Sequence, residues 1–457
     1  KNDLPDVQFI SGAFAAHLIE GTSVRAVFAS PGLTPIETLP VIAAAQAMGL
    51  WIGGELSLFV QALENLKATR DYAPQVLAIT GTNGKTTVTA LTGLLIERAG
   101  KTVKVAGNIG PTLLDTLRLS MATELPEVWV LELSSFQLDN AGPFEPSAAT
   151  VLNITQDHLD WHGNMAAYAA AKEKIFGASS LMVLNRDDAR VMAMLPEPVR
   201  AKLQKPVIRA HITYGAEMPQ RPGDFGLETV NGMTWLVRAL EADETRRLRK
   251  GEVEEIHIQR LMPADALRIR GRLNAVNALA ALALATSTGA SLASMLFGLR
   301  EYKGEPHRVE PVAIVNEVEY FDDSKGTNVG ATVAALLGLG AERRVVVILG
   351  GEGKGQDFSP LAEPVARYAR AVVLIGRDAP LIREEIKACG VPLIDASTLP
   401  EAVNAAKNMA QAGDAVLLSP ACASFDMFRD YPHRAQVFCQ AVAEIAEAAG
   451  QVMEASL

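Results

Sequence analysis

A glycine-rich turn with a lysine and two threonines is the strongest chemical pattern in the sequence. Residues 81–87 read Gly-Thr-Asn-Gly-Lys-Thr-Thr, after a β-branched run at 76–80 and before a helical pattern. Strand, glycine turn and helix in this order let backbone N–H groups and the helix N-terminus bind phosphate. We expect Lys85 to neutralise phosphate oxygens and the Thr86 hydroxyl to bind Mg²⁺. The general motif has a glycine where this sequence has Ile79, so a solvated lysine on a plain glycine turn is the alternative.

A phosphate loop also needs a carboxylate at the end of a neighbouring strand, where it binds the metal ion. Glu132 is the only charged residue in the apolar run 128–133. A lone carboxylate in such a strand costs free energy unless it is paired or metal-bound. We therefore predict a metal ligand at Glu132, with a structural ion pair as the alternative.

Other polar residues of this half leave their roles open. His158 follows the predicted strand 149–154, where an imidazole is either a cap or a metal ligand, although Mg²⁺ prefers oxygen. Lys172 and Lys174 lie in an Ala-rich helical pattern and by themselves look like surface charges. Asn277 lies in a later helical pattern and by default is a packed polar residue.

Dense polar turns follow apolar strands in the C-terminal third, at 320–328, 349–357 and 418–426. In open α/β sheets, ligands bind at the carboxyl ends of parallel strands, where we place these turns. The turn at Gly350 lacks the G-x-G-x-x-G spacing, so a dinucleotide site is poorly supported. Cys422 has no evident paired histidine, and we favour a small buried thiol over a nucleophile there.

Short β-branched runs alternate with longer Ala/Leu-rich patterns, which predicts α/β domains with parallel sheets. The region 207–267 has short alternating segments instead, and we expect a small antiparallel patch there. The strands expected in parallel sheets are 24–29, 76–80, 128–133, 149–154, 181–185, 345–349, 372–375 and 415–418.

Turn-rich joints at 71–74 and 303–306 divide the chain into segments 1–74, 75–305 and 306–457. Three domains agree with a length of 457 residues at about 150 residues per domain. The first segment opens as if inside a βα unit and contains no glycine-rich turn. We expect that an initial βαβ piece, about 30 residues or more, is absent from this chain.

The composition excludes several classes of protein. The net charge of −10 argues against a broad nucleic-acid or anionic-membrane surface. Three widely spaced cysteines give neither a disulfide framework nor a zinc site, which predicts a reducing cytoplasm. Residues 273–299 carry no charge, but their small and polar residues and a break at 287–289 predict two packed helices rather than a membrane span. Because the chain starts with polar residues and no apolar run follows them, we expect no signal peptide in this segment.

Taken together, the polar runs resemble the Mur ligase family, whose relatives include folylpolyglutamate synthase. The family has a shortened phosphate loop, which explains Ile79, and the matches follow one another in order between residues 76 and 431. The matching runs are residues 80–87, 107–110, 131–138, 153–160, 307–310, 323–328, 350–354 and 418–424.

The resemblance implies a three-domain enzyme of peptidoglycan precursor synthesis. It implies a Rossmann-like N-terminal domain for the UDP end of the substrate, incomplete here, a central ATP-binding domain and a Rossmann-like C-terminal domain for the amino acid. The runs are most similar to the member that joins D-glutamate to UDP-N-acetylmuramoyl-L-alanine. In that reaction, ATP phosphorylates the L-alanyl carboxylate, and the D-glutamate amine attacks the acyl phosphate.

The same resemblance implies a role for each matching residue. The residues implied for ATP are Gly81, Thr82, Asn83, Gly84, Lys85, Thr86, Thr87, Asn277, Arg308 and Asp323. The resemblance also implies two Mg²⁺ ions. Thr86 and Glu132 would bind the first ion, and His158 and Lys172 would bind the second. Lys172 matches a lysine that the family carbamylates, which replaces its charge with an oxygen donor. Those implied for UDP-N-acetylmuramoyl-L-alanine are Asn108, Ser135, Gln137 and His158. Those implied for D-glutamate are Lys325, Thr327, Lys354, Ser424 and Tyr431, the last standing where a Phe is common.

Two alternatives from different classes stay open. Another amide ligase of the family would add L-alanine, a diamino acid or a dipeptide, and the run 419–424 argues against it. A phosphate-loop NTPase acting as a switch would need no lysine-rich C-terminal pocket. Besides the two substrates we expect no nucleic-acid or membrane partner, and we expect a monomer.

Overall fold

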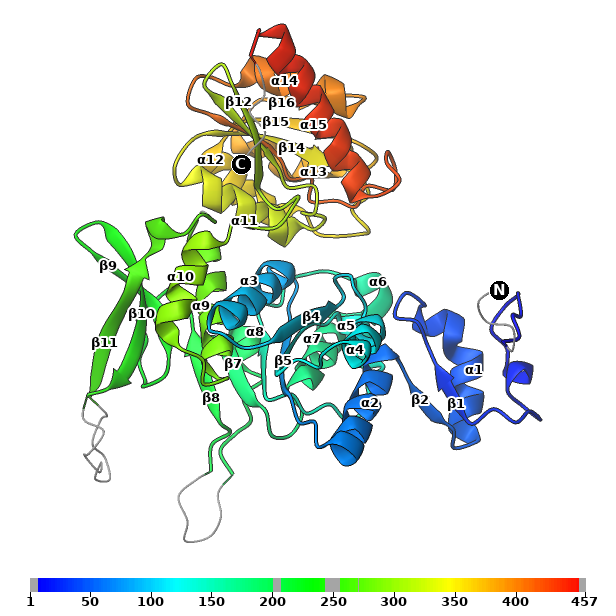
Figure 1. The fold of residues 1–457 in the computed structure, drawn as a ribbon. Coiled ribbons are helices and arrows are strands. Elements are labelled where there is room, and N and C mark those ends of the chain that lie inside the picture. Colours follow the sequence, from blue (N-terminus) through cyan, green and yellow to red (C-terminus); the bar gives the residue numbers. More distant parts are fainter. Residues whose placement is uncertain (1–6, 200–206, 243–254, 270, 452–457) are drawn as a thin grey trace.

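The N-terminal block is a small βαβ unit that lies to one side of the molecule (Figure 1). The structure, a computed structural model, describes residues 7–199, 207–242, 255–269 and 271–451. The elements of this block are η1 (Ala16–Leu18), β1 (Ala26–Phe28), α1 (Pro35–Ala47) and β2 (Trp51–Gly53). Strands β1 and β2 pair in parallel, and the Thr34 side chain caps α1 by accepting a hydrogen bond from the Glu37 N–H.

Helix α2 (Glu55–Arg70) leads from this block into the central domain. Its Phe59 is fully buried and packs edge-to-face against Trp129 of the central sheet, with ring centroids 5.2 Å apart. The helix therefore shares the hydrophobic core of the central domain. The division at residue 74, like the other domain limits, stays a prediction.

The central domain is built on a parallel sheet, as expected. Among the described residues its strand order is β4-β5-β3-β6-β7-β8, and hydrophobic clusters cover both faces. The strands are β3 (Gln75–Thr80), β4 (Val103–Gly107), β5 (Val128–Glu132), β6 (Ala148–Val151), β7 (Leu181–Asn185) and β8 (His211–Tyr214). The helices between them are α3 (Lys85–Arg98), α4 (Leu113–Ala122), α5 (Ser135–Asp139), α6 (Leu159–His162), α7 (Met165–Glu173), η2 (Lys174–Phe176) and α8 (Ala189–Met192). Because β3 lies between β5 and β6, the turns after these strands meet at one edge.

An antiparallel patch and two helices complete the central domain. Strands β9 (Phe225–Val230), β10 (Met233–Glu241) and β11 (Ile256–Pro263) form the antiparallel sheet expected in this region, and η3 (Ala264–Ala266) follows. The uncharged segment forms two helices, α9 (Arg272–Thr286) and α10 (Leu292–Glu301), with the expected break between them. Within the described part of the chain, no helix is long and apolar enough to cross a bilayer.

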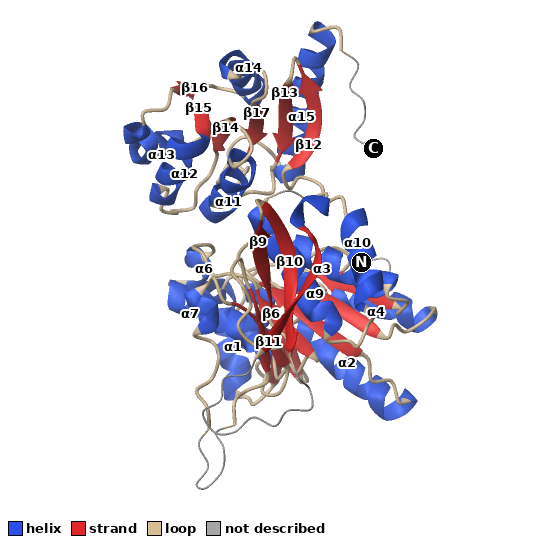
Figure 2. Cartoon of the chain, turned by 90° about the vertical axis from the view of Figure 1, so that its left-hand side faces the viewer, coloured by secondary structure: helices blue, strands red, loops and turns tan. Residues whose placement is uncertain are grey.

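The C-terminal domain stands above the central domain and has a sheet of its own (Figures 1 and 2). Its described strands are ordered β12-β13-β17-β14-β15-β16, and only the edge strand β12 is antiparallel. The strands are β12 (Glu310–Val315), β13 (Val318–Asp322), β14 (Val345–Gly350), β15 (Ala369–Ile375), β16 (Leu393–Asp395) and β17 (Ala415–Leu418). The helices are α11 (Val329–Gly340), η4 (Ser359–Leu361), α12 (Ala362–Tyr368), α13 (Ala379–Ile386), η5 (Lys387–Cys389), α14 (Leu399–Met409) and α15 (Tyr431–Ala448).

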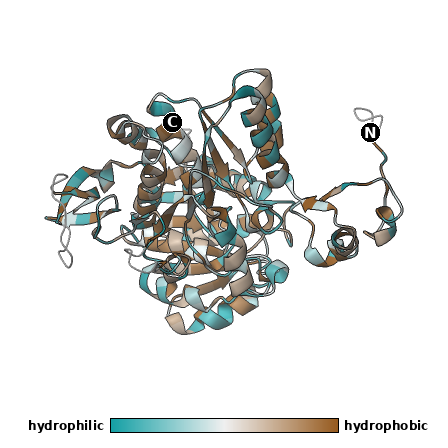
Figure 3. Ribbon diagram, turned by 90° about the horizontal axis from the view of Figure 1, so that it is seen from below, coloured by the Kyte–Doolittle hydropathy of each residue, from teal (hydrophilic) through white to brown (hydrophobic). Residues whose placement is uncertain are grey.

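Hydrophobic strands form the interior of both large domains (Figure 3). The order of the C-terminal sheet puts β17 between β13 and β14, although it comes last in sequence. The three polar turns that follow these strands are therefore neighbours at one edge of the sheet. The expected α/β class, with a parallel central sheet and a small antiparallel patch, is confirmed.

Candidate active site

The glycines of the phosphate loop are required by its close packing. Gly81 and Gly84 have φ angles of +154° and +84°. A Cβ at Gly81 would lie 2.9 Å from the Leu152 Cβ, and one at Gly84 would lie 2.9 Å from the Asn277 Oδ1. Helix α3 begins directly after Gly84, so its free N–H groups face the turn. Asn277 thus lies against the phosphate loop.

Lys85 curls back over this loop. Its Nζ donates hydrogen bonds to the carbonyls of Gly81 at 2.9 Å and Thr82 at 2.8 Å. Burial lowers the pKa of Lys85, while Glu132 and Asp157 oppose that shift. These contacts argue against a freely solvated lysine, and a phosphate-binding role for Lys85 stays a prediction.

Lys172, from α7, approaches the base of the same loop. It is 1% exposed, and its Nζ donates to Thr80 Oγ1 at 3.2 Å and to the Gly81 carbonyl at 2.9 Å. The ammonium also lies 4.7 Å from the centre of the Tyr168 ring. Burial, and secondarily the charge of Lys85, lower the pKa of Lys172 well below its usual value.

Lys174, two residues later, has the opposite environment. Its side chain is half exposed and pairs with Asp139 at 2.9 Å. The expectation of a surface charge is thus confirmed for Lys174. For Lys172 that same expectation is wrong, because α7 turns this side chain inward.

Glu132 ends β5 with one carboxylate oxygen unused. Its Oε1 accepts a hydrogen bond from Asn108 Nδ2 at 2.8 Å, and the residue is 1% exposed. Its Oε2 is buried and has no hydrogen-bond partner, and no lysine or arginine of the described residues pairs with it. The alternative of a structural ion pair therefore finds no partner there. An unpartnered, buried carboxylate oxygen is a suitable ligand for a hard divalent cation.

His158 precedes α6 in the left-handed conformation, with φ at +53°. Its side chain makes no capping hydrogen bond, contrary to one of the two roles considered for it. The imidazole packs edge-to-face against Phe136 and lies 3.6 Å from an Asp157 carboxylate oxygen. Burial lowers the pKa of His158, and Asp157 opposes the shift, so the neutral imidazole with its free lone pair is favoured.

Two of the residues expected to bind UDP-N-acetylmuramoyl-L-alanine, Ser135 and Gln137, lie on α5 beside His158. Ser135 is buried and its Oγ lies 2.9 Å from the His162 Nε2. Gln137 Oε1 accepts a hydrogen bond from the Ser134 N–H at 2.9 Å, which closes a capping box at the start of α5. Burial lowers the pKa of His162 to about 4, so its ring is neutral at physiological pH. The structure thus adds His162, which no sequence motif had selected.

Two cations of the C-terminal domain reach the phosphate loop. Arg308 Nη2 donates to Thr86 Oγ1 at 3.0 Å, and Lys325 Nζ lies 3.4 Å from the same oxygen. Burial lowers the pKa of Lys325, and Arg308 acts in the same direction. The amino-acid side of the predicted site therefore meets the nucleotide side at the Thr86 hydroxyl.

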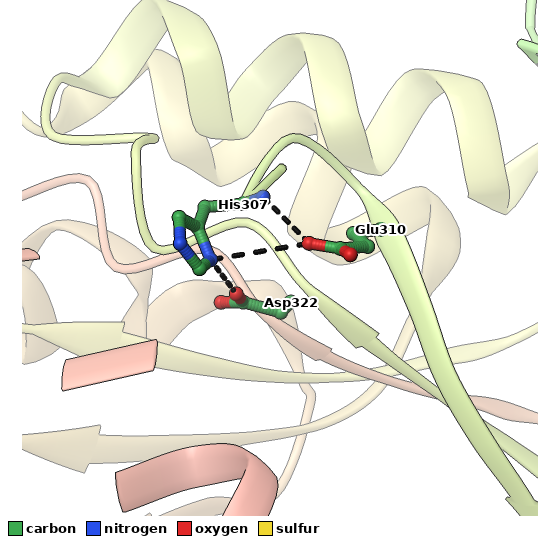
Figure 4. Close-up of side chains that lie close together, drawn as sticks. All are labelled: His307, Glu310 and Asp322. Carbon is green, nitrogen blue, oxygen red and sulfur yellow. Dashed lines mark hydrogen bonds and ion pairs between the residues drawn. The ribbon is translucent and has the colours of Figure 1, made fainter. Parts of the chain in front are cut away.

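His307 fixes the chain just before Arg308 (Figure 4). Its ring Nδ1 lies 2.7 Å from Asp322 Oδ2, and its backbone N–H donates to Glu310 Oε2 at 2.7 Å. Asp322 also accepts hydrogen bonds from the N–H and hydroxyl of Ser324. The three side chains could hold a metal ion by their spacing, but these hydrogen bonds already account for the arrangement.

Asp323 is a buried acid beside this cluster. It is 5% exposed, accepts a hydrogen bond from Ser419 Oγ at 2.6 Å and lies 3.3 Å from the Val309 N–H. Burial raises the pKa of Asp323 to about 7, although the hydrogen bond from Ser419 and the charge of Arg308 oppose the shift.

The residues expected to bind D-glutamate form two groups at this edge. Lys325 lies 5.8 Å from the centre of the Tyr431 ring, and the Thr327 N–H donates to the Lys325 carbonyl. Lys354 is exposed and lies 5.8 Å from the centre of the Phe425 ring. A backbone bridge between Glu352 and Ala423 joins the loop of Lys354 to the loop of the buried Ser424.

Asn328 was missed as an individual site residue, although it ends one of the quoted runs. Its Nδ2 donates to Asn83 Oδ1 at 3.1 Å and lies 3.2 Å from Asp157 Oδ2, so it joins the two large domains. Its Oδ1 caps α11 by accepting from the Ala331 N–H. Cys422 is fully buried, and burial raises the pKa of its thiol to about 12, as expected for an unreactive cysteine.

Comparison with known proteins decides the family. The sequence profile of the Mur ligase middle domain matches residues 79–285, and that of the Mur ligase, glutamate ligase domain matches residues 307–422. The chain belongs to the Mur ligase family. The UDP-N-acetylmuramoylalanine–D-glutamate ligase of Albidiferax ferrireducens is 70% identical over 99% of this chain and 90% of its own. The ligase of the same name from Burkholderia thailandensis is 58% identical over 96% of this chain and 88% of its own.

Solved Mur ligase structures have the same fold at much lower identity. The MurF crystal structure from Acinetobacter baumannii has a TM-score of 0.60 and 17% identity, covering 92% of this chain and 90% of that one. A MurF ligase of Thermotoga maritima in complex with ADP has a TM-score of 0.59 and 16% identity, covering 95% of this chain and 97% of that one. The multi-domain Mur ligase fold therefore extends over nearly all of the chain.

Proposed function

We propose that this Mur ligase is an ATP-dependent amide ligase that joins D-glutamate to UDP-N-acetylmuramoyl-L-alanine in peptidoglycan precursor synthesis. Relatives that are 57–70% identical are named UDP-N-acetylmuramoylalanine–D-glutamate ligase, and they align along nearly the whole chain. One structural observation supports the proposal most directly. Lys325 and Arg308 of the C-terminal domain both reach Thr86 of the phosphate loop, so a nucleotide phosphate and an incoming amino acid would meet there.

Magnesium fits the acidic side of this site. Glu132 has a buried carboxylate oxygen without a hydrogen-bond partner among the described residues. This oxygen and the Thr86 hydroxyl would hold one ion, which would displace the Arg308 and Lys325 contacts with that hydroxyl. His158, whose neutral ring has a free lone pair, would hold the second ion together with a carbamylated Lys172. When bound, magnesium supplies positive charge that shields the phosphate and carboxylate oxygens.

Carbamylation of Lys172 needs a neutral amine. The lone pair of Nζ attacks the carbon of CO₂, and the nitrogen gives up a proton, which leaves an N-linked carboxylate. Burial favours the neutral amine by lowering the pKa of Lys172. The modification thus replaces a cation, which would repel magnesium, with an oxygen donor.

The chain's own residues then act on two successive displacements. An oxygen of the L-alanyl carboxylate attacks the γ-phosphorus of ATP, the bond to the β,γ-bridging oxygen breaks, and ADP leaves. Lys85 and the N-terminus of α3 stabilise the charge that moves during this transfer. The neutral amine of D-glutamate next attacks the carbonyl carbon of the acyl phosphate, and the nitrogen of the tetrahedral adduct gives up a proton to water. The adduct then expels phosphate as the C–O bond breaks and the amide forms. Lys325, Thr327, Lys354, Ser424 and Tyr431 would orient the amino acid.

Phosphate release tests the proposal. With ATP, magnesium and UDP-N-acetylmuramoyl-L-alanine, we expect release that depends on D-glutamate and a product heavier by one glutamyl residue. Release of phosphate without any amino acid would favour an NTPase switch instead. Turnover only with L-alanine, a diamino acid or a dipeptide and the matching UDP-linked acceptor would assign another ligase of the family. A cytoplasmic location and a monomeric state remain predictions alongside this proposal.

A further inference from the structure

Arg434 is a buried cation that the proposed reaction does not use. It lies in the first turn of α15, is 1% exposed and is among the largest fully buried side chains. No ion pair joins its guanidinium to a described carboxylate, although the charges of Asp426, Asp322 and Asp323 act on it from farther away. Burial lowers the pKa of Arg434 to about 10, so the group keeps its charge at neutral pH. Burying an unpaired charge is costly, and a residue kept at this cost requires a reason.

The contacts of Arg434 supply that reason. Its Nη1 donates to the Cys422 carbonyl at 3.1 Å, and its Nη2 donates to the Ser324 carbonyl at 2.8 Å. These carbonyls belong to two loops that leave the neighbouring parallel strands β13 and β17. One planar guanidinium therefore holds the two loops at a fixed separation. A lysine, with a single nitrogen, cannot match that two-pronged geometry.

Both loops carry residues of the amino-acid site. Ser324 directly precedes Lys325, and Cys422 lies two residues before Ser424. Tyr431 lies three residues before Arg434 on the same helix, and its ring faces Lys325. Fixing the two carbonyls thus fixes the spacing of three residues that are expected to surround D-glutamate.

The charge has a second consequence. A neutral side chain could also tie two carbonyls, at a smaller desolvation cost. The guanidinium instead leaves a positive charge behind the site, which Asp322, Asp323 and Asp426 offset only in part. The low dielectric of the interior strengthens the attraction of the remaining charge for an anion. D-Glutamate carries two carboxylates, and its side-chain carboxylate separates it from the neutral D-amino acids.

We propose that Arg434 is a positioning residue that aligns the Lys325 and Ser424 loops and increases selectivity for an amino acid with an anionic side chain. The inference rests on the proposed function. It attributes the geometry of the pocket to the guanidinium fork and part of the selectivity to its charge.

Two variants separate these contributions in the full-length enzyme. In Arg434→Lys the charge remains but the fork is lost, so we expect the KM for D-glutamate to rise about tenfold while the KM values for ATP and the UDP-linked substrate stay within about twofold. In Arg434→Met the charge is lost as well. We expect its preference for D-glutamate over D-glutamine, a neutral isostere, measured as the ratio of the two kcat/KM values, to be about tenfold lower than that of Arg434→Lys.

Phe438→Leu is the matched control, because Phe438 is fully buried one turn later on α15 and contacts neither loop carbonyl through a hydrogen bond. We expect it to lower Tm and leave all three KM values and the D-glutamate preference unchanged. Parallel increases in every KM in both Arg434 variants, or an unchanged KM for D-glutamate in folded Arg434→Lys, would overturn the inference. If Arg434→Met does not fold, the Arg434→Lys comparison decides alone. A wild-type enzyme that does not ligate D-glutamate would instead refute the proposed function.

Discussion

The two large domains use the same edge of a parallel sheet in different ways. In the central domain, the turns after β3 and β5 enclose charged groups almost completely: Lys172 and Glu132 are each 1% exposed. Burial lowers the pKa of Lys85 and of Lys172, and one oxygen of Glu132 has no hydrogen-bond partner among the residues that the structure describes. Charges in such a dry setting act strongly on a reacting group because little solvent screens them.

The corresponding edge of the C-terminal domain is more open. Lys354 is exposed and Lys325 is half-buried, each beside an aromatic ring. The buried ionisable groups described at this edge are Asp322, Asp323 and Arg434, and protein hydrogen bonds hold each of them. The difference indicates that the central edge is organised for charge transfer and the C-terminal edge for admitting and orienting a ligand.

Replacing Lys85 with Ala tests most directly whether the central edge acts in phosphoryl transfer. We expect kcat to fall by on the order of 10³ or more, because positioned positive charge contributes most to phosphoryl transfer. Folding should persist, since Nζ bonds only to carbonyls of its own loop. Turnover measured under saturating substrates, with Tm as a check on folding, tests this. Near-normal turnover would remove Lys85 from the mechanism.

Lys172→Ala tests whether the buried amine acts through an added carboxylate. We expect kcat to fall by at least about 10², and a short carboxylate such as acetate to restore part of it by filling the space. Lys174→Ala, two residues away, is the matched control and should behave as wild type because its ion pair is exposed. Mass spectrometry of native protein should also detect the CO₂ adduct on Lys172. Full activity of Lys172→Ala would contradict the assignment.

Lys354→Ala probes the open edge with the same substitution. Here we expect the KM for D-glutamate to rise about tenfold with a much smaller change in kcat, because the exposed ammonium would attract the ligand without touching the phosphoryl group. The wild type should strongly prefer D-glutamate to D-alanine, and this preference should narrow in the variant. Initial rates with both amino acids measure it. Equal wild-type rates with the two would argue against a site for a dicarboxylate.

The sequence predicted most of what periodicity and local motifs encode. The strands at 76–80, 181–185 and 415–418 and the glycine turn at Gly81 match the structure closely, because each is marked by neighbouring residues. Strands β2, β4, β8 and β16 were not predicted, because their pairing depends on the complete sheet and not on a local pattern. Strand β8 also corrects one expectation: it lies in the region expected to form an antiparallel patch, but it pairs in parallel with β7. The sheet orders, which bring β17 beside β13, likewise depend on long-range packing.

The site residues show the same distinction between features that are visible in the local sequence and features that depend on long-range packing. Glu132 stood out because a lone charge in an apolar strand is visible in sequence. Lys172 did not, since a lysine on an Ala-rich helix looks exposed until the helix is placed against the phosphate loop; only the family resemblance selected it. Arg434 and His162 were missed because their roles depend on which carbonyl or hydroxyl the fold brings near them.

The last prediction concerns Asp323 and the pH dependence of stability. Its pKa is raised to about 7 in the folded protein, whereas an unfolded Asp has a pKa of about 3.9. Between these values the folded state keeps a proton that the unfolded state has lost, so stability falls as pH rises, by at most about 1.4 kcal/mol per pH unit from this group. Above about pH 7 both states are ionised and this contribution levels off.

Asp323→Asn should therefore reduce the loss of stability with rising pH, because an amide does not ionise in this range. The amide oxygen can still accept the hydrogen bond from Ser419 Oγ. Thermal unfolding of both proteins from about pH 5 to about pH 8 should give Tm curves whose difference grows with pH in favour of the variant. Ser419→Ala sharpens the test: Ser419 donates to Asp323 and favours its ionised form, so its removal should extend the wild-type decline to higher pH. Parallel Tm curves for wild type and Asp323→Asn would contradict the prediction, because they would show that the Asp323 carboxyl is already ionised in the folded protein at these pH values. The C-terminal domain would then hold a buried carboxylate, as the central domain does at Glu132.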